Sequence, residues 1–243
     1  MGASSAFWTP VIGALARVSP AGEGSFSKGR LVIAPDMIGF GRSIPGSPEH
    51  PPDFISWLRA FLDALGLKKV DLAGHSLGGA IALRFTLEHP ERVERIVLVG
   101  AIGFGASLVG VLAAGLFMVP SNPVTRPILR RMLSSRPGLI PSVPRGKKRK
   151  PSFDRGMAMR IMRATGWNGL PSFRREELSR ISQPVLLLWG EKDAIVPLSI
   201  AKRLMGNLRR AQLKTVSGGG HMPFLENPTE FTEKLSEFLD SEE

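Results

Sequence analysis

Short, mostly apolar runs alternate with amphipathic stretches along much of the chain. The runs are rich in Val, Ile and Leu, as expected for buried strands, and lie at residues 31–34, 70–73, 96–99, 185–189 and 213–216. The amphipathic stretches have the spacing of helices and lie at residues 4–17, 54–65, 80–88, 199–205 and 231–239. This alternation predicts an α/β fold in which a mostly parallel sheet is covered by helices on both faces.

Residues 101–181 break this alternation and carry the whole excess of positive charge of the protein. The chain has a formal net charge of +11, and this segment holds 15 Lys and Arg against 3 Asp and Glu, whereas the rest holds 17 against 18. We therefore expect a core formed by residues 1–100 and 182–243, and a basic, mostly helical lid formed by residues 101–181, inserted after the strand at 96–99.

Two stretches in or next to the predicted lid bear on whether the protein binds nucleic acid or a membrane. The basic run Arg145–Lys150 lies between two prolines and has no interleaved aromatic residues, so we interpret it as a solvated loop and expect no nucleic acid partner. Residues 96–125 have no charged side chain, but five glycines and Pro120 interrupt them. We expect an apolar lid helix over residues 108–117 that faces a pocket, and the apolar, basic lid leaves contact with a membrane surface open.

The strongest chemical signal is the sequence Gly-His-Ser-Leu-Gly at residues 74–78, between a predicted strand and a predicted helix. This G-x-S-x-G pattern predicts a nucleophile elbow with Ser76 at its tip. We expect Gly74 and Gly78 to be required because the turn is too tight for side chains, and Gly79 to let the helix approach the sheet. The Leu77 amide, at the helix N-terminus, would stabilise a developing oxyanion.

A serine nucleophile needs a base, and the base needs an acid that orients it. His221 follows a glycine-rich loop after the last strand and is the predicted base, while the other three histidines, His50, His75 and His89, are predicted to be structural. Asp193 is the predicted acid because it follows the strand at 185–189, with Glu191 as its nearest rival. Ser, Asp and His then occur in the order found in α/β-hydrolases.

From about residue 5 onwards the chain resembles an α/β-hydrolase-fold serine hydrolase with a lid. The resemblance rests on the segments at residues 35–43, 74–78, 190–197 and 220–228. It implies acylation of Ser76, with His221 as base and then acid, Asp193 holding the imidazolium, and water releasing the acyl group. A serine at the elbow separates the chain from the dehalogenases and epoxide hydrolases of this fold, which use aspartate there.

The resemblance leaves the reaction open between several hydrolase classes. The Gly-His-Ser and Gly-His-Met-Pro contexts look like those of carboxylesterases or lipases, and the apolar lid favours an ester or related compound with an apolar acyl group. The turn at residues 36–41 is similar to that of hydrolases that cleave carbon–carbon bonds in ring-fission products. Perhydrolase or acyltransferase chemistry, and a truncated protein without catalysis, are the further alternatives.

The chain departs from this family at its start. Relatives carry about three strands and a His-Gly-x-Gly loop before the first helix, and the x residue of that loop donates the second oxyanion amide. By alignment Met1 falls on this donor position, and the third of those strands would lie between the runs at 31–34 and 70–73. We therefore expect Met1 to be an internal methionine of a longer natural chain.

Composition excludes several other classes. The absence of cysteine rules out disulfide scaffolds, thiolate metal sites and cysteine nucleophiles, and it fits a cytoplasmic protein. The scattered histidines predict no metal, and the lack of a glycine-rich phosphate loop after a strand predicts no nucleotide cofactor. No signal peptide opens the sequence, and the oligomeric state is not readable from it.

Overall fold

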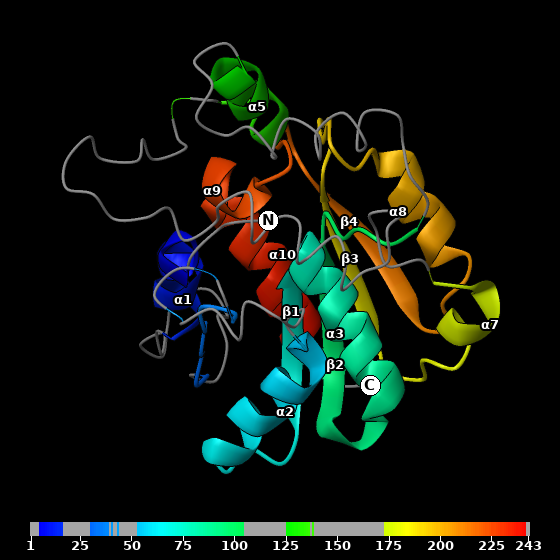
Figure 1. Cartoon of the computed structure of the whole chain (residues 1–243). Coiled ribbons are helices and arrows are strands. Elements are labelled where there is room, and N and C mark those ends of the chain that lie inside the picture. The colour runs from blue at the N-terminus through cyan, green and yellow to red at the C-terminus, as the bar shows by residue number, and fades with distance from the viewer. Residues whose placement is uncertain are drawn as a thin grey trace.

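The computed structural model describes residues 5–16, 30–38, 40, 43, 53–104, 125–136, 138 and 173–241. These residues contain one sheet of four parallel strands in the order β1-β2-β3-β4, formed by Val70–His75, Val93–Val99, Val185–Gly190 and Ala211–Val216 (Figure 1). The predicted parallel sheet is thus confirmed, and each of these four strands is one to three residues longer than its apolar run.

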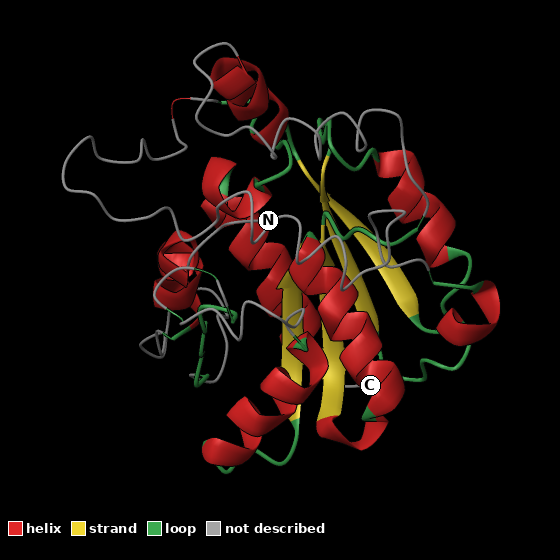
Figure 2. Ribbon diagram, viewed as in Figure 1, coloured by secondary structure: helices red, strands yellow, loops and turns green. Residues whose placement is uncertain are grey.

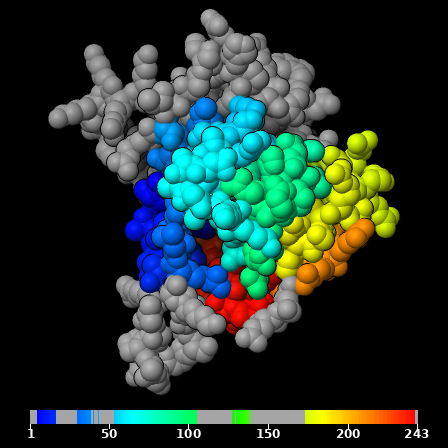
Figure 3. All heavy atoms as spheres, turned by 90° about the horizontal axis from the view of Figure 1, so that it is seen from below, coloured from blue at the N-terminus to red at the C-terminus, as the bar shows by residue number. Residues whose placement is uncertain are grey.

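Helices cover both faces of the sheet, as predicted (Figure 2). Three pack on one face, namely α2 (Phe54–Ala64), α3 (Leu77–Glu88) and α8 (Leu198–Met205). On the other face lie α1 (Thr9–Leu15) and α10 (Pro228–Asp240). Seen from below, the cyan and green helices lie on the opposite side of the molecule from the red C-terminal helix (Figure 3). The remaining described helices are η1 (Ser5–Trp8), η2 (Pro90–Arg92), α5 (Thr125–Leu133), α7 (Arg175–Leu178) and α9 (Pro223–Glu226).

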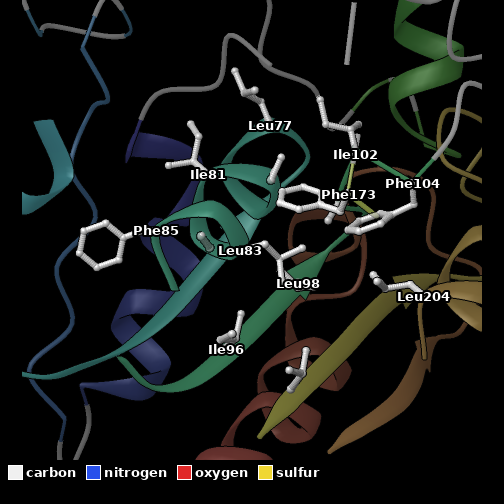
Figure 4. Close-up of a cluster of buried hydrophobic side chains, with 14 of the residues drawn as sticks. Leu77, Ile81, Leu83, Phe85, Ile96, Leu98, Ile102, Phe104, Phe173 and Leu204 are labelled. Carbon is white, nitrogen blue, oxygen red and sulfur yellow. The ribbon is translucent and has the colours of Figure 1, made fainter. Parts of the chain in front are cut away.

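The alternation of side chains along the strands builds two hydrophobic layers. Ile96 and Leu98 of β2 face the layer of α2, α3 and α8, while Val97 and Val99 face the layer of α1 and α10. All four side chains are buried, because successive residues of a strand point to opposite faces and both faces are covered. Figure 4 shows Ile96 and Leu98 beneath Leu83 of α3. This packing fixes the sheet and therefore the position of each strand end.

Local sequence signals set the helix ends. Asp53 caps α2, since its Oδ1 accepts hydrogen bonds from the amides of Ile55 and Ser56 at 3.1 and 2.9 Å. Gly66 follows the end of α2 with a φ of +67°, a conformation that glycine adopts without steric cost. The helix after the elbow begins at Leu77 rather than at residue 80 as predicted, because the chain enters it directly from the turn at Ser76.

The strand predicted at residues 31–34 is not formed. Residues 30–37 have no strand or helix, and Leu31 is 80% exposed although the prediction required it to be buried. An apolar run favours burial, but a strand also needs a hydrogen-bonded neighbour. β1 is the edge strand of the described sheet and does not pair with this segment. Val32 instead packs against the layer formed by α1 and α10.

The described parts of the segment at 101–181 contain two helices, α5 and α7. Its two ends meet, because the amide of Phe173 donates to the carbonyl of Gly103 at 3.0 Å and the ring of Phe173 stacks on Phe104 (Figure 4). The apolar helix predicted at 108–117 and the basic run at 145–150 lie outside the described residues, so the lid remains a prediction. Among the helices that the structure describes, none is long and apolar enough to cross a membrane.

Candidate active site

Ser76 lies in the sharp turn between β1 and α3. It is the only non-glycine residue with a positive φ in the described part of the chain, with φ 54° and ψ −115°. Its amide donates to the carbonyl of Val99 at 2.9 Å, which ties the turn to the end of β2. Such a conformation costs about 1–3 kcal/mol and is found mainly at functional sites. The strand–turn–helix geometry expected for the G-x-S-x-G pattern is present.

The glycines around Ser76 are not equally constrained. A Cβ on Gly74 would lie 2.3 Å from the carbonyl oxygen of Gly78, and a Cβ on Gly79 would lie 2.5 Å from the Cβ of Ala101. A Cβ on Gly78 would meet no described atom within 4 Å, so the prediction that the turn excludes a side chain there is wrong. The main chain of Gly78 is what approaches Gly74, so of these two glycines the constraint falls on Gly74.

The two predicted oxyanion donors differ in what the structure says of them. Leu77 is the first residue of α3, and amides in the first turn of a helix lack partners within the helix and carry partial positive charge. Its amide follows Ser76 directly at the start of α3, and its oxyanion role stays a prediction. Met1 lies outside the described residues, so its role as second donor stays a prediction.

His221 and Asp193 form a buried pair. Nδ1 of His221 lies 2.9 Å from Oδ2 of Asp193, and the two side chains are 1% and 0% exposed. The other oxygen of Asp193, Oδ1, accepts hydrogen bonds from the amides of Ile195 and Val196 at 2.9 and 2.8 Å. A carboxylate accepts, so Nδ1 of His221 is the donor in this hydrogen bond, and in the neutral ring the lone pair then lies on Nε2. This is the tautomer that a general base requires.

His75 holds the main chain of His221. Its Nε2 lies 2.7 Å from the carbonyl oxygen of His221 and donates to it, and the two rings are 4.7 Å apart. Burial lowers the pKa of His75 well below 6.5, and the nearby His221 lowers it further. His75 is therefore neutral at pH 7. The prediction made it structural, and the structure adds that it anchors the predicted base.

The pair of His221 and Asp193, called the dyad below, lies at the same edge of the sheet as Ser76, without a described hydrogen bond to the Ser76 hydroxyl. A hydrogen bond from the hydroxyl of Ser76 to His221 is not among those formed by the described residues. Ser76 is adjacent in sequence to His75, which contacts His221 directly. Catalytic hydrogen bonds are often long in proteins without substrate and tighten when it binds. The structure thus brings His75, the neighbour of Ser76, against the predicted base, and the approach of the Ser76 hydroxyl to His221 stays a prediction.

Two glycines at strand ends escaped the sequence reasoning. Gly100, after β2, has a φ of +51°, and a Cβ on it would lie 3.0 Å from both Oδ2 of Asp193 and Nδ1 of His221. Gly190, at the end of β3, leaves room for the main chain of Gly220, whose oxygen would be 2.0 Å from an added Cβ. A glycine directly after an apolar strand was the available signal, but it does not by itself reveal which side chain approaches.

The remaining described candidates, Glu191 and His89, form other contacts. Glu191, the rival acid, accepts from the amide of Gly218 at 3.0 Å and does not contact His221. His89 lies 3.9 Å from Glu91, and His50 is outside the described residues. In the part of the chain that the structure describes, no three His, Asp or Glu side chains are grouped so that they could hold a metal ion.

Comparison with known proteins places this site in a family. A family model described as "Alpha/beta hydrolase family" matches residues 1–234. The chain belongs to the alpha/beta hydrolase family. Other members include a 2-hydroxymuconate semialdehyde hydrolase from Pseudomonas putida, 30% identical over 90% of this chain and 81% of its own length. A 2-hydroxy-6-oxo-2,4-heptadienoate hydrolase from P. putida F1 is also 30% identical, over 89% of this chain and 81% of its own.

Solved structures agree with this alpha/beta hydrolase assignment. A variant of CumD, a meta-cleavage product hydrolase from Pseudomonas fluorescens IP01, superposes with a TM-score of 0.80 at 25% identity, covering 98% of this chain and 86% of its own. A naproxen esterase from Bacillus subtilis has a TM-score of 0.73 at 23% identity, over 98% and 80% of the two chains, and shows the fold alone. The similar proteins are named as hydrolases and an esterase, and the chain is an alpha/beta hydrolase enzyme.

Proposed function

We propose that this chain is a serine hydrolase in which Ser76 is the nucleophile, His221 the general base and Asp193 the residue that orients the imidazole. The observation that carries the proposal is the buried hydrogen bond from Nδ1 of His221 to Oδ2 of Asp193, at the sheet edge where Ser76 sits in a strained turn. A buried imidazole whose Nδ1 is held by a carboxylate is oriented to accept a proton at Nε2 from a hydroxyl.

The reaction follows from these positions. Oγ of Ser76 attacks a carbonyl carbon while its proton moves to Nε2 of His221, and Asp193 stabilises the imidazolium that forms. The Leu77 amide, with Met1 as the proposed second donor, holds the oxyanion of the tetrahedral intermediate. The intermediate collapses to an acyl-enzyme, and the leaving group takes the proton from His221. Water then attacks the acyl carbon and gives a proton to His221. When this second tetrahedral intermediate collapses, His221 returns the proton to Oγ of Ser76 and the acid is released.

The first substrate class is an ester or related acyl compound with an apolar acyl group. Its support is the set of apolar side chains beside the elbow, where Leu77, Ile102 and the stacked pair Phe104 and Phe173 gather at the carboxyl end of the strands (Figure 4). These side chains are buried in the structure, and an acyl chain that reached them would gain free energy by burying its methylene groups.

The second class is the product of aromatic ring fission, cleaved at a carbon–carbon bond. It is favoured by the relatives at 30% identity, which are hydrolases of 2-hydroxymuconate semialdehyde and of 2-hydroxy-6-oxo-2,4-heptadienoate. In this reaction the leaving group departs with its electron pair on carbon, so His221 must deliver the proton to carbon rather than to oxygen. The nucleophile, the base and the acid keep the same roles.

Two measurements test the proposal and separate the classes. A fluorophosphonate should label the protein and should fail to label Ser76→Ala, whereas equal labelling of both would exclude Ser76 as the nucleophile. We expect kcat/KM for p-nitrophenyl esters of graded chain length to exceed that for a ring-fission dienone if the first class holds, and the reverse if the second holds. A protein that takes no label and turns over neither substrate would be the non-catalytic alternative.

A further inference from the structure

Glu226 is a buried carboxylate for which the reaction has no use. It lies at the end of α9, is 4% exposed, and accepts hydrogen bonds from two separate parts of the chain. Its Oε1 accepts from the amide of Gly220 at 3.0 Å, and its Oε2 accepts from the amide of Ser135 at 2.9 Å and from the hydroxyl of Ser135. All three donors are neutral groups.

These donors belong to the two segments that meet above the sheet. Gly220 immediately precedes His221, and Ser135 follows α5 in the segment at 101–181 (Figure 1). The two are so close that a Cβ on Gly220 would lie 2.7 Å from the amide nitrogen of Ser135. The hydroxyl of Ser135 also lies 2.8 Å from the carbonyl of Gly218, in the same loop. The end of α5 is thus docked on the loop that carries the predicted base.

Both carboxyl oxygens of Glu226 are hydrogen-bonded to neutral groups. No salt bridge to its carboxylate is formed among the residues that the structure describes, and the nearby guanidinium of Arg136 donates to its main-chain oxygen at 3.3 Å. A buried carboxylate is costly unless its oxygens are hydrogen-bonded. Because both oxygens accept, only a carboxylate satisfies the loop and the end of α5 together. A glutamine side chain would present its NH₂ to one of the two amides.

We propose that Glu226 is a positioning residue that holds the His221 loop and the end of α5 in one arrangement, so that docking of this segment helps to set the imidazole. The inference rests on the proposed function, because it assigns a reason to place His221 accurately. His221 is then held at three points: Asp193 at Nδ1, His75 at its carbonyl, and Glu226 at the preceding amide. Of these three contacts, only that of Glu226 also reaches Ser135.

The test measures Glu226→Gln, Ser135→Ala and the double variant that combines these two changes. The matched control is Glu233→Gln, which alters an exposed carboxylate on α10. We expect Glu226→Gln to lower kcat about 10- to 100-fold, since a small displacement of a catalytic group has effects of this size. KM should change little, because Glu226 touches no substrate. Ser135→Ala should lower kcat less, and its effect should shrink in the Glu226→Gln background because the two residues act through one contact.

A second readout does not depend on turnover. The Nδ1 proton of His221, identified by its loss in His221→Gln, gives a proton NMR signal that reports its hydrogen bond to Asp193. We expect Glu226→Gln to shift or broaden this signal and Glu233→Gln to leave it unchanged. If the wild type proves inactive, the proposed function fails, and this signal still decides the role of Glu226.

The inference is overturned by a Glu226→Gln protein with wild-type kcat and an unchanged Nδ1 signal. It is also overturned if the loss of activity disappears when rates are divided by the concentration of folded protein, since Glu226 would then serve stability alone. If Glu226→Gln does not fold, Ser135→Ala carries the test. In that case an unaltered kcat together with an unaltered signal refutes the proposal.

Discussion

Replacing Gly100 by alanine tests how closely the end of β2 is fitted to the dyad. The new methyl group would lie 3.0 Å from Oδ2 of Asp193 and 3.0 Å from Nδ1 of His221, the two atoms that share the hydrogen bond of 2.9 Å. Ordinary contacts are a few tenths of an ångström longer, so both atoms must move. The methyl group presses on the bond from one side, and the substitution therefore weakens the contact that sets the imidazole.

The expected free-energy cost of Gly100→Ala has two parts. A left-handed backbone costs a non-glycine residue about 1–2 kcal/mol, and Gly100 has a φ of +51°. Overpacking a tight site adds about 1–3 kcal/mol. The first part affects stability only, whereas the second acts on the dyad and should lower kcat about 10- to 100-fold.

Gly66→Ala is the matched control. Gly66 has a φ of +67°, but a Cβ on it would meet no described atom within 4 Å, so alanine there bears the backbone cost without the contact. We expect its free energy of unfolding to fall by about 1–2 kcal/mol. Each kcal/mol corresponds to roughly 2–4 °C in Tm for a protein of this size. Its kcat should equal that of the wild type.

The assay measures Tm and the kcat of folded protein for the same ester in all three proteins. The expected result is a modest fall of Tm in Gly66→Ala, and a larger fall of Tm together with a loss of kcat in Gly100→Ala. The reasoning is refuted if Gly100→Ala keeps the kcat of Gly66→Ala, because the dyad would then tolerate the methyl group.

Three further predictions concern the same region. In Asp193→Asn the two backbone amides keep the side-chain oxygen, so NH₂ faces His221 and forces the wrong tautomer; steady-state kinetics should show kcat lower by about 10⁴-fold, and a loss under tenfold would contradict this. The pKa of His75 lies well below 6.5, so the unfolded chain binds a proton that the folded chain does not, and stability is lost as pH falls below 6.5. Denaturant titrations should show a slope of up to about 1.4 kcal/mol per pH unit that is smaller in His75→Asn, and an identical slope would exclude His75 as its source. Gly74→Ala should lower Tm far more than Gly78→Ala, because only Gly74 faces the carbonyl at 2.3 Å; equal Tm values would show that the turn relaxes.

Much of the architecture could be predicted because it depends on local chemistry. The apolar strands required two covered faces, and the G-x-S-x-G pattern required a strand–turn–helix, which is where Ser76 lies. Asp193 and His221 were predicted from their places after strands, and the carboxyl ends of parallel strands do meet at one edge.

The predictions that failed depended on tertiary neighbours. The run at 31–34 is apolar, but composition does not show whether another strand lies beside it to accept and donate hydrogen bonds. We expected that the turn leaves no room for a side chain at Gly78, whereas it is the main chain of Gly78 that leaves no room for a side chain at Gly74. The contact of Glu226 with Ser135 joins residues 91 positions apart, and no spacing in the sequence reveals it.

The order of the strands explains why glycines end β2 and β3. Ser76 follows β1, and His221 follows β4 at the far side of the sheet, so the His221 loop must cross the ends of the two strands between them to reach β1. It passes over Gly190, where an added Cβ would meet the oxygen of Gly220 at 2.0 Å, and the dyad then lies against Gly100. The hydrogen bond of 2.7 Å between His75 and the carbonyl of His221 marks its arrival at β1. A side chain at either crossing would displace the His221 loop, so these two glycines belong to the candidate active site although neither has a reactive group.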